Sequence, residues 1–377
     1  MKNVRFERIP ENSDEPPMFS ARGKYRRRYR EQFEKLKVHP GETEIPLDNL
    51  AERVDDANVS LNSAQKRAIR EYSADSDRDM VDLSDFESML TSKRAQPSRM
   101  KRIMYDIADP VISESQKVEV RSYIDSYNCF PPPIFILLVT IIEISIFFYY
   151  YETDGRGSIW TDCAGCFVHH NHSDPGVLIF VPKLRAEAWR FCSYMLLHSG
   201  LNHLIGNMVV QLLVGIPLEV VHKAWRIAPL YILAVVTGSL LQYAVDPNAL
   251  LVGASAGVYA LIMAHVSNVI LNWHEMPFRW VRVAVLSTFI LFDVCGALYR
   301  RFVISQCESI SILAHVAGAI TGLLFGYFSL YNVVELKWEK IVKWVALGLY
   351  TAFLVLTVTM AVVRVPHSKA LWEDSSC

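Results

Sequence analysis

The chain has almost no net charge: 38 lysines and arginines stand against 39 aspartates and glutamates, which leaves a formal charge of -1. Proteins that bind nucleic acid present a strong positive field to the phosphates, so this balance gives no support to a nucleic-acid partner. We also expect no cleaved signal peptide, because the charged segment 1–17 lacks an apolar core beside a small-residue cleavage site.

Charged residues are concentrated in the first 130 residues, whereas the rest consists of long apolar runs separated by short charged breaks. A helix needs about 20 apolar residues to cross the hydrocarbon layer. The first run, 132–151, meets that length and is expected to act as an uncleaved signal anchor. Lys117 and Arg121 before it outweigh Arg156 after it, which predicts a cytoplasmic N-terminus.

The apolar runs predict an all-α polytopic membrane protein with seven transmembrane helices. They cover residues 132–151, 191–218, 228–246, 251–273, 282–298, 311–332 and 342–363. With the N-terminus inside, the loops expected in the cytoplasm (222–226, 274–282 and 335–343) each carry Lys or Arg, as cytoplasmic loops usually do. Arg300 and Arg301 fall on the opposite side and are the exception.

We divide the chain into seven parts on this basis. They are a disordered N-terminus (1–20), a cytoplasmic helical region (21–95), a linker (96–131), a six-span core (132–333), a cytoplasmic loop (334–341), a seventh helix (342–363) and an exoplasmic tail (364–377). The membrane is expected to belong to the secretory pathway, at the Golgi, the endosome or the plasma membrane. The oligomeric state stays open at this stage.

The cytoplasmic region, 21–95, contains the outline of an EF-hand pair. A helix over 61–72, an acidic loop over 74–85 and a helix over 86–90 form one unit, and residues 33–54 form its partner. We expect this region to be α-helical and EF-hand-like, with a degenerate sequence.

The acidic loop lacks part of the calcium ligand set. When Val81 takes the apolar loop position, Ala74 stands in place of the first carboxylate, Asp79 in place of the turn glycine and Asp85 in place of the bidentate glutamate. We therefore expect an EF-hand-like region that serves interaction, with calcium binding as the less favoured alternative.

The loop 152–185 is the longest break between apolar runs and is expected outside the cytoplasm, where its sequon at Asn171 is open to glycosylation. It also contains Cys163 and Cys166 near the histidines at 169, 170 and 172, a set of zinc ligands by residue type. The chain has seven cysteines and no second pair at finger-like spacing. A local disulfide or a simple solvated loop is therefore favoured over a metal site.

Reactive polar side chains occur inside the apolar runs, where burying them in hydrocarbon is costly. Ser255 lies in Gly253-Ala-Ser-Ala-Gly257, which has the Gly-x-Ser-x-Gly pattern of a nucleophile elbow but is placed within an apolar helix. Taken alone, the segment indicates close helix packing, with Ser255 bonded to a backbone carbonyl.

His315 changes that interpretation, because it is an ionisable group inside the sixth run. Gly318 and Gly322 follow it on a small-xxx-small seam that permits close helix contact. Ser255 and His315 each lie about four residues from the expected outer ends of their helices, at a depth of about 6 Å. The two residues are therefore candidates for a nucleophile and its general base.

A third group of polar residues lies in the second run. His203 and Asn207 are spaced i and i+4, on one face of a helix, where neutral donors can stabilise an oxyanion. The alternatives are hydrogen bonds between helices or a metal site made by His198 and His203. On an ideal helix these two histidines lie about 140° apart, so shared ligation needs distortion.

These segments together resemble the rhomboid family of intramembrane serine proteases. The resemblance rests on Trp189-Arg190, then His-x-x-x-x-His-x-x-x-Asn, Gly-Ala-Ser-Ala-Gly and Ala-His-x-x-Gly-x-x-x-Gly, in this order and spacing, and it covers residues 132–363. The EF-hand-like region before the core and the extra helix after it resemble the animal rhomboid-related type, which has six spans plus one.

The resemblance implies a dyad with no acid, in which Ser255 attacks the scissile carbonyl and His315 accepts its proton. It implies an oxyanion hole made by His203, Asn207 and the backbone N–H of Ser255. Every motif position carries the expected residue. The chain is therefore not expected to be one of the catalytically dead members, which lack the serine or the histidine.

Five further residues have supporting roles by the same resemblance. Gly253 shapes the turn before the helix, and Tyr259 stacks on the catalytic imidazole, although an ordinary core aromatic would show the same pattern. Trp189 and Arg190 belong to the membrane-embedded first loop, and His198 supports that loop.

The implied reaction is hydrolysis of a peptide bond in or beside the transmembrane helix of a single-span substrate in the lipid bilayer. It needs no cofactor, and it releases an ectodomain outside the cytoplasm; EGF-like growth-factor precursors are substrates by resemblance only. One rival is a non-proteolytic rhomboid-like chaperone or trafficking factor that binds transmembrane clients. A transporter or channel is the other, but we find no inverted repeat in the sequence.

Overall fold

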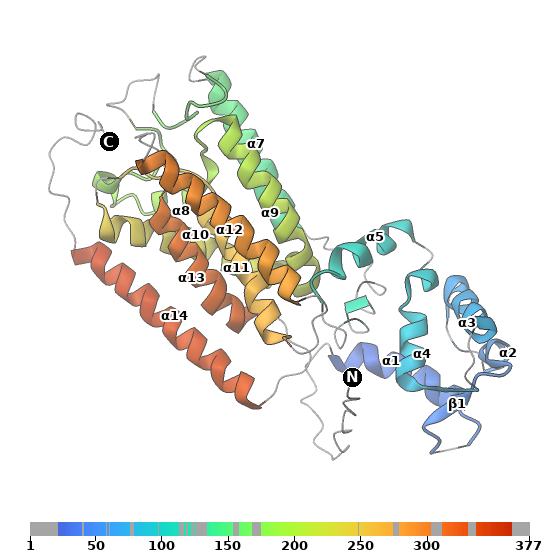
Figure 1. The fold of residues 1–377 in the computed structure, drawn as a ribbon. Coiled ribbons are helices and arrows are strands. Elements are labelled where there is room, and N and C mark those ends of the chain that lie inside the picture. The colour runs from blue at the N-terminus through green and yellow to red at the C-terminus, as the bar shows by residue number, and fades with distance from the viewer. Residues whose placement is uncertain are drawn as a thin grey trace. The chain divides into compact units, whose positions relative to one another are not determined.

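The computed structural model of the chain (Figure 1) contains two compact units, residues 1–102 with 118–128 and residues 103–117 with 129–377. Each unit is considered by itself below. The structure describes residues 22–39, 41–57, 59, 61–75, 79–96, 98–112, 117, 120–121, 124, 134–153, 158–167, 175–247, 249–273, 279–302, 311–330 and 337–363.

Some of the predicted features lie outside the described residues. They are the disordered N-terminus (1–20), the sequon at Asn171, the three histidines at 169, 170 and 172, and the exoplasmic tail (364–377).

The first unit consists of two helix–strand–helix halves followed by a short turn. Its elements are α1 (Arg22–Leu36), β1 (Glu44–Pro46), α2 (Leu50–Asp56), α3 (Ser63–Asp75), β2 (Met80–Asp82), α4 (Leu83–Leu90) and the 3-10 turn η1 (Lys93–Ala95). The strands pair antiparallel with Ile45 opposite Val81, and both side chains are fully buried. Phe33 of α1 and Phe86 of α4 meet with ring centroids 5.6 Å apart. One apolar core therefore joins the two halves.

The acidic loop of this unit is shorter than the sequence predicted. Because α3 runs to Asp75, the position expected for the first calcium ligand, Ala74, lies in a helix. α4 begins at Leu83, three residues before its predicted start. Asp82 explains the early start, since its side chain accepts a hydrogen bond from the backbone N–H of Asp85 at 2.7 Å and caps the helix.

The second unit is a helical bundle. α5 (Arg99–Ala108) begins in the first unit and leads into it. The other elements are α7 (Ile134–Thr153), η3 (Pro182–Leu184), α8 (Arg190–Ser193), η4 (Tyr194–Leu196), α9 (Gly200–His222), α10 (Ala224–Val245), α11 (Ser255–Leu271), α12 (Arg279–Phe302), α13 (Ile312–Ser329) and α14 (Lys337–Val363).

Several of these helices are suited to a membrane. In the described part of the chain, five of them (α7, α9, α10, α13 and α14) are long and apolar enough to cross a bilayer. α11 is apolar but has only 17 residues, and α12 covers 24 residues. The protein is therefore a mostly helical polytopic membrane protein, and the total of seven spans stays a prediction.

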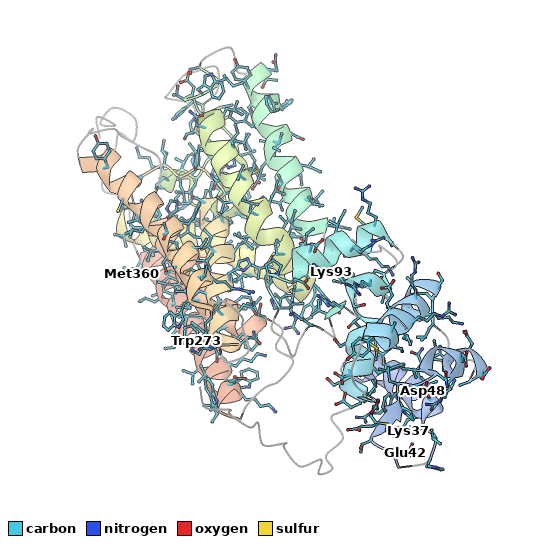
Figure 2. All side chains as sticks on the ribbon, turned by 45° about the vertical axis from the view of Figure 1, so that its right-hand side comes forward. Lys37, Glu42, Asp48, Lys93, Trp273 and Met360 are labelled. Atoms are coloured by element: carbon cyan, nitrogen blue, oxygen red, sulfur yellow. A yellow bond between two sulfur atoms is a disulfide. The ribbon has the colours of Figure 1, made fainter. Side chains whose placement is uncertain are left out.

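Large apolar side chains cover the outside of the bundle. Ile141 on α7 is 61% exposed and Val362 on α14 is 72% exposed. Figure 2 shows side chains projecting outward along these helices, with Met360 of α14 labelled. Water-soluble proteins seldom expose apolar surface on this scale, whereas contact with lipid requires it.

The second apolar run is not one helix, contrary to the prediction. α8 and η4 end at Leu196, and α9 starts only at Gly200. Gly200 has a φ of +79°, and a Cβ at this position would overlap the carbonyl oxygen of Trp160. His198 therefore lies outside the helix that carries His203, and the argument from helical angles does not apply to this pair.

The fourth run also begins differently from the prediction. α11 starts at Ser255, four residues after the expected start of the span. Ser255 is thus the first residue of its helix, whereas His315 is the fourth residue of α13. The expectation that both lie equally far from their helix starts was wrong, because an extended segment replaces the first turn of α11.

Candidate active site

Ser255 follows a short extended segment that is held by backbone hydrogen bonds. Leu251 exchanges two such bonds of 3.2 Å with Phe180, and the N–H of Gly253 donates to the carbonyl of Tyr194 at 3.1 Å. Gly253 has a φ of +108°, a conformation that glycine adopts at little cost. This bonding stops the helix from starting earlier, so Ser255 is presented at the N-terminus of α11.

His315 of α13 faces this serine. Its Nε2 atom lies 2.8 Å from the Oγ atom of Ser255, within hydrogen-bonding distance. Ser311 caps α13 by accepting a hydrogen bond from the N–H of Ala314 at 2.9 Å, one residue before His315. Ser255 is partly buried and His315 is only 6% exposed. The pair therefore has the geometry of a hydroxyl and an adjacent base.

Glycines bring the two helices together. A Cβ at Gly318 would overlap the carbonyl oxygen of Ala256, and a Cβ at Gly322 would overlap that of Ala260. The backbone of α13 therefore approaches the backbone of α11 closely at two points, one helical turn apart. Only residues without a side chain allow such an approach.

Tyr259 lies one turn after Ser255 on α11 and covers one face of the imidazole of His315. The ring centroids are 4.4 Å apart and the planes are inclined by 16°. Tyr259 is itself 6% exposed. A stacked ring that is buried restricts rotation of the imidazole away from Ser255.

His203 of α9 lies beside the segment before Ser255. A Cβ at Gly253 would be only 2.7 Å from the Cε1 atom of His203, so glycine is needed for space as well as for φ. The N–H of Ser199 donates to Nδ1 of His203 at 3.4 Å, and the amide of Asn207 donates to the His203 carbonyl at 3.0 Å. The backbone N–H of Ser255, in the first turn of α11, has no partner within its own helix.

Comparison with known proteins gives a family for this arrangement. The Rhomboid domain matches residues 185–332. Rhomboid-related protein 1 of Caenorhabditis elegans is 61% identical over 360 residues, which cover 96% of this chain and 100% of the relative. The chain belongs to the rhomboid family. Rhomboid-related protein 2 of Mus musculus is 39% identical over 243 residues, which cover 63% of this chain and 78% of the relative.

One similar rhomboid is named as inactive. Inactive rhomboid-related protein 2 of Caenorhabditis elegans is 30% identical over 284 residues, which cover 74% of this chain and 77% of the relative. Membership of the rhomboid family alone therefore does not establish catalysis. The positions of Ser255 and His315 in this chain are the observation that bears on it.

Trp189 and Arg190 anchor the loop at the start of the rhomboid domain. Arg190 is buried, and its Nη1 atom donates to the carbonyls of Gly176 at 2.6 Å and Ile179 at 2.8 Å. Trp189 is half exposed, and its indole N–H donates to the carbonyl of Val177 at 3.2 Å. Both side chains therefore hold the backbone of the same loop rather than the proposed dyad.

His198 is fully buried in the rhomboid domain, and its two ring nitrogens have no hydrogen-bond partner among the described residues. Its ring packs edge-on against His203, with centroids 5.3 Å apart. No group of three or more metal-binding side chains occurs in the described ranges. Cys163 and Cys166 form a disulfide, so these two thiols are not zinc ligands.

A buried polar cluster behind Ser255 was missed in the sequence. Glu143 of α7, Gln211 of α9 and Tyr231 of α10 are each fully buried. Gln211 donates to Glu143 at 2.9 Å, and the Tyr231 hydroxyl donates to Gln211 at 2.7 Å. The ring of Tyr231 fills the space that a Cβ at Gly257 would take. An acid in an apolar run is the same signal that drew attention to His315, and it would have found Glu143.

Proposed function

We propose that this rhomboid is an intramembrane serine endopeptidase that cleaves single-span membrane proteins. The observation that carries the proposal is the distance of 2.8 Å between Oγ of Ser255 and Nε2 of His315. A serine hydroxyl is a weak nucleophile until an adjacent base removes its proton. Polar and ionisable side chains are costly to bury on apolar helices, so a pair of them that meets between two such helices marks a functional site.

The reaction begins when Oγ of Ser255 attacks the scissile carbonyl carbon and Nε2 of His315 takes the hydroxyl proton. The tetrahedral intermediate then collapses, the C–N bond breaks, and His315 delivers the proton to the leaving amine. A water molecule, deprotonated by His315, then attacks the acyl ester, the bond between the acyl carbon and Oγ of Ser255 breaks, and His315 returns the proton to Oγ, which completes the cycle. No acid is required to complete a triad in this scheme.

The oxyanion of the intermediate is stabilised by neutral donors. The backbone N–H of Ser255 lies at the N-terminus of α11, where the helix dipole favours negative charge. His203 lies against the Gly253 turn, and Asn207 follows one turn later on the same helix. One amide N–H of Asn207 is used by the His203 carbonyl, which leaves its second N–H for the oxyanion.

The substrate must expose its backbone to be cut. A transmembrane helix hides its carbonyls in internal hydrogen bonds, so it has to unwind before Ser255 can reach one. We therefore expect a preference for residues that weaken helices near the cleaved bond. Small residues at the cleavage position and EGF-like growth-factor precursors as substrates are expectations from the family resemblance.

The cleaved ectodomain is released on the side opposite the cytoplasm. Support comes from the loop that carries the Cys163–Cys166 disulfide, because Cys163 forms a β-bridge with Ser199 and Cys166 packs in a cluster with Val252. These contacts are beside the site of Ser255. Disulfides persist in the lumen and outside the cell, so the site faces that compartment in a membrane of the secretory pathway.

The test is cleavage of a single-span reporter by the purified full chain in proteoliposomes, with the products sequenced by mass spectrometry. We expect Ser255→Ala and His315→Ala to abolish cleavage. Ser145→Ala is the matched control, because Ser145 is exposed on α7 and its hydroxyl donates to the carbonyl of Ile141 in its own helix. Cleavage that persists in the Ser255→Ala protein would disprove this mechanism.

A second result would favour the rival function. If the unaltered chain cleaves no reporter in a broad panel, but co-purifies with intact single-span proteins, the protein is a binding factor for transmembrane clients. This outcome has to be tested for because one similar rhomboid is named as inactive. If only the Ser255→Ala protein retains clients, the result is still compatible with a proteolytic function, because an inactivated protease also holds its substrate.

We further propose that the first unit is a degenerate EF-hand pair that serves interaction. The pairing of Ile45 with Val81 supports this, since two linked loops pair through one apolar residue each in such units. Ala74 in α3 offers no carboxylate, and Asp82 is used to cap α4. Calcium titrated into the full chain should therefore give no saturable heat in calorimetry, and a saturable isotherm would overturn the proposal of an interaction-only unit.

A further inference from the structure

A cavity of about 610 Å³ lies between α10, α13 and α14, at the end of the bundle remote from Ser255. The position follows from α13, which has His315 in its first turn and ends at Ser329, a residue of the cavity wall. The other walls come from the first two turns of α10 and of α14. The cavity is therefore separate from the proposed catalytic site.

Aromatic rings form the apolar part of the wall. Trp225 of α10, Phe325 and Phe328 of α13, and Trp344 of α14 all line the cavity. The rings of Phe328 and Trp344 are in contact, with centroids 5.6 Å apart. Rings from three helices thus surround one concave space, in which a hydrocarbon segment has favourable contacts.

Cations form the polar part of the wall. Arg226, Lys340 and Lys343 line the cavity, and no carboxylate does so among the described residues. The guanidinium of Arg226 lies over the ring of Trp225 at 4.4 Å and donates a hydrogen bond to the carbonyl of Ser329. Lys340 and Lys343 are three residues apart on α14, hence on one face of that helix. Three positive charges from two helices therefore meet at one cavity.

The acid next to these lysines is not part of the cavity wall. Glu339 precedes Lys340 on α14 and is only 6% exposed, and it is not among the wall residues. The wall formed by the described residues therefore carries basic side chains from both α10 and α14. Charge complementarity favours an anionic occupant.

We propose that this cavity binds the headgroup of an anionic membrane phospholipid. The phosphate lies among Arg226, Lys340 and Lys343, and the glycerol and upper acyl chain lie against Phe328 and Trp344. The location of the cavity agrees with a headgroup site, because tryptophans with arginine or lysine mark the level of lipid headgroups at the ends of transmembrane helices. Basic pockets between such helices are suited to acidic headgroups.

An ordinary interfacial belt of tryptophan and lysine does not account for the arrangement. In a belt each side chain reaches the headgroup layer by itself, and no enclosed space is needed. Here residues of three helices line one concave space, and Arg226 is held in place by both Trp225 and the Ser329 carbonyl. A preformed site of this kind binds with less loss of side-chain entropy.

The bound lipid would join α14 to the rest of the bundle. The Rhomboid domain match ends at residue 332, so α14 (Lys337–Val363) lies beyond it. Arg226 belongs to the matched domain, whereas Lys340 and Lys343 belong to α14. One phosphate shared by these residues bridges the two parts, and the lipid should therefore raise the thermal stability of the chain.

The test uses the full chain in nanodiscs of phosphatidylcholine alone or of phosphatidylcholine with phosphatidylserine. Retained lipid is identified by native mass spectrometry after extraction, and unfolding is followed by tryptophan fluorescence. We expect retained phosphatidylserine and a higher Tm in the mixed nanodiscs. Lys340→Gln with Lys343→Gln should lower the apparent affinity by about tenfold, whereas Lys340→Arg with Lys343→Arg should keep it.

The matched control removes two positive charges elsewhere, by Arg67→Gln with Arg70→Gln on the exposed side of α3. We expect this control to retain phosphatidylserine as the unaltered chain does. An equal loss in the control would show bulk electrostatic attraction and overturn the cavity assignment. Equal retention of phosphatidylcholine and phosphatidylserine by the unaltered chain would also overturn the assignment. This comparison uses no variant, so it does not depend on whether a variant folds.

A free anion is distinguished from a lipid by competition. Inorganic phosphate or glycerophosphate added to the purified chain should not displace phosphatidylserine, because it lacks the acyl contacts with Phe328 and Trp344. Displacement by glycerophosphate at matched concentration would assign the cavity to a soluble phosphate ligand instead. Both results are independent of proteolysis by Ser255.

Discussion

The ring of Tyr259 lies nearly parallel to the imidazole of His315, with centroids 4.4 Å apart and planes inclined by 16°. Tyr259 belongs to the helix that begins with Ser255, so one helix supplies the proposed nucleophile and also holds the proposed base in place. The Nε2 atom of that imidazole is 2.8 Å from the serine hydroxyl. Loss of the stack should therefore affect the chemical step more than substrate binding.

Replacing Tyr259 tests this relationship. Aromatic pairs contribute about 0.5 to 1.5 kcal/mol beyond the area they bury, so Tyr259→Ala should lower kcat by up to about tenfold with little change in KM. Tyr259→Phe keeps the ring and should retain most of kcat. Initial rates on the reporter in proteoliposomes measure both values. A loss in Tyr259→Phe equal to that in Tyr259→Ala would instead assign the effect to the phenol hydroxyl.

Gly253 should tolerate no side chain. Its φ of +108° is unfavourable for other residues, and a Cβ would lie 2.7 Å from the His203 ring. We expect Gly253→Ala to lower kcat/KM by at least about tenfold, since an L-residue at positive φ costs about 1 to 2 kcal/mol and the clash adds to it. Gly348→Ala on α14 is the control, because nothing lies within 4 Å of a Cβ there. Normal activity in Gly253→Ala would show that the turn is not tied to the site.

Asn207 should act on the transition state rather than on binding. Removing one oxyanion donor costs about 100- to 1,000-fold in kcat in other serine enzymes, and we expect Asn207→Ala to show a loss of this order with KM nearly unchanged. Asn207→Asp should be worse than Asn207→Ala, because a carboxylate repels the oxyanion. If KM rises and kcat is kept in Asn207→Ala, the residue binds substrate and is not an oxyanion donor.

Gly318 should determine the packing of α13 against α11. A side chain here would overlap the carbonyl oxygen of Ala256, and overpacking of this kind costs about 1 to 3 kcal/mol. Gly318→Val should therefore lower Tm in detergent and also lower activity, because the base moves away from Ser255. Gly348→Val, in open space, should leave Tm close to that of the unaltered chain. An unchanged Tm in Gly318→Val would mean that the helices separate at no cost.

Much of the site was predictable from the sequence because its chemistry is unusual for its surroundings. Ser255, His315 and His203 stand out as polar or ionisable residues in apolar runs, and burial of such groups in hydrocarbon is costly enough to require a use. Hydropathy likewise predicted the helices of the bundle, since the length of an apolar run reflects the thickness of the bilayer. The same criterion would have found Glu143 but not its partners Gln211 and Tyr231, which come from other helices.

The exact starts of two helices were not predictable in the same way. The sequence started the helix of Ser255 four residues too early and placed His198 on the helix of His203, and the structure corrects both. In each case a bond to a distant segment decides the outcome. Leu251 is bonded to Phe180, and the Gly253 N–H is bonded to the Tyr194 carbonyl, so these residues are unavailable to a helical turn.

The sequence by itself therefore determined the membrane character, the order of the motifs and the identity of the proposed dyad, because these depend on residue type and on spacing along the chain. Tertiary structure alone decided that Ser255 begins α11, that His315 comes within 2.8 Å of it, and that α10, α13 and α14 together line a basic aromatic cavity. Those features depend on contacts between residues far apart in the chain. A hydrogen bond or a glycine contact between two helices has no counterpart in the local pattern of either one.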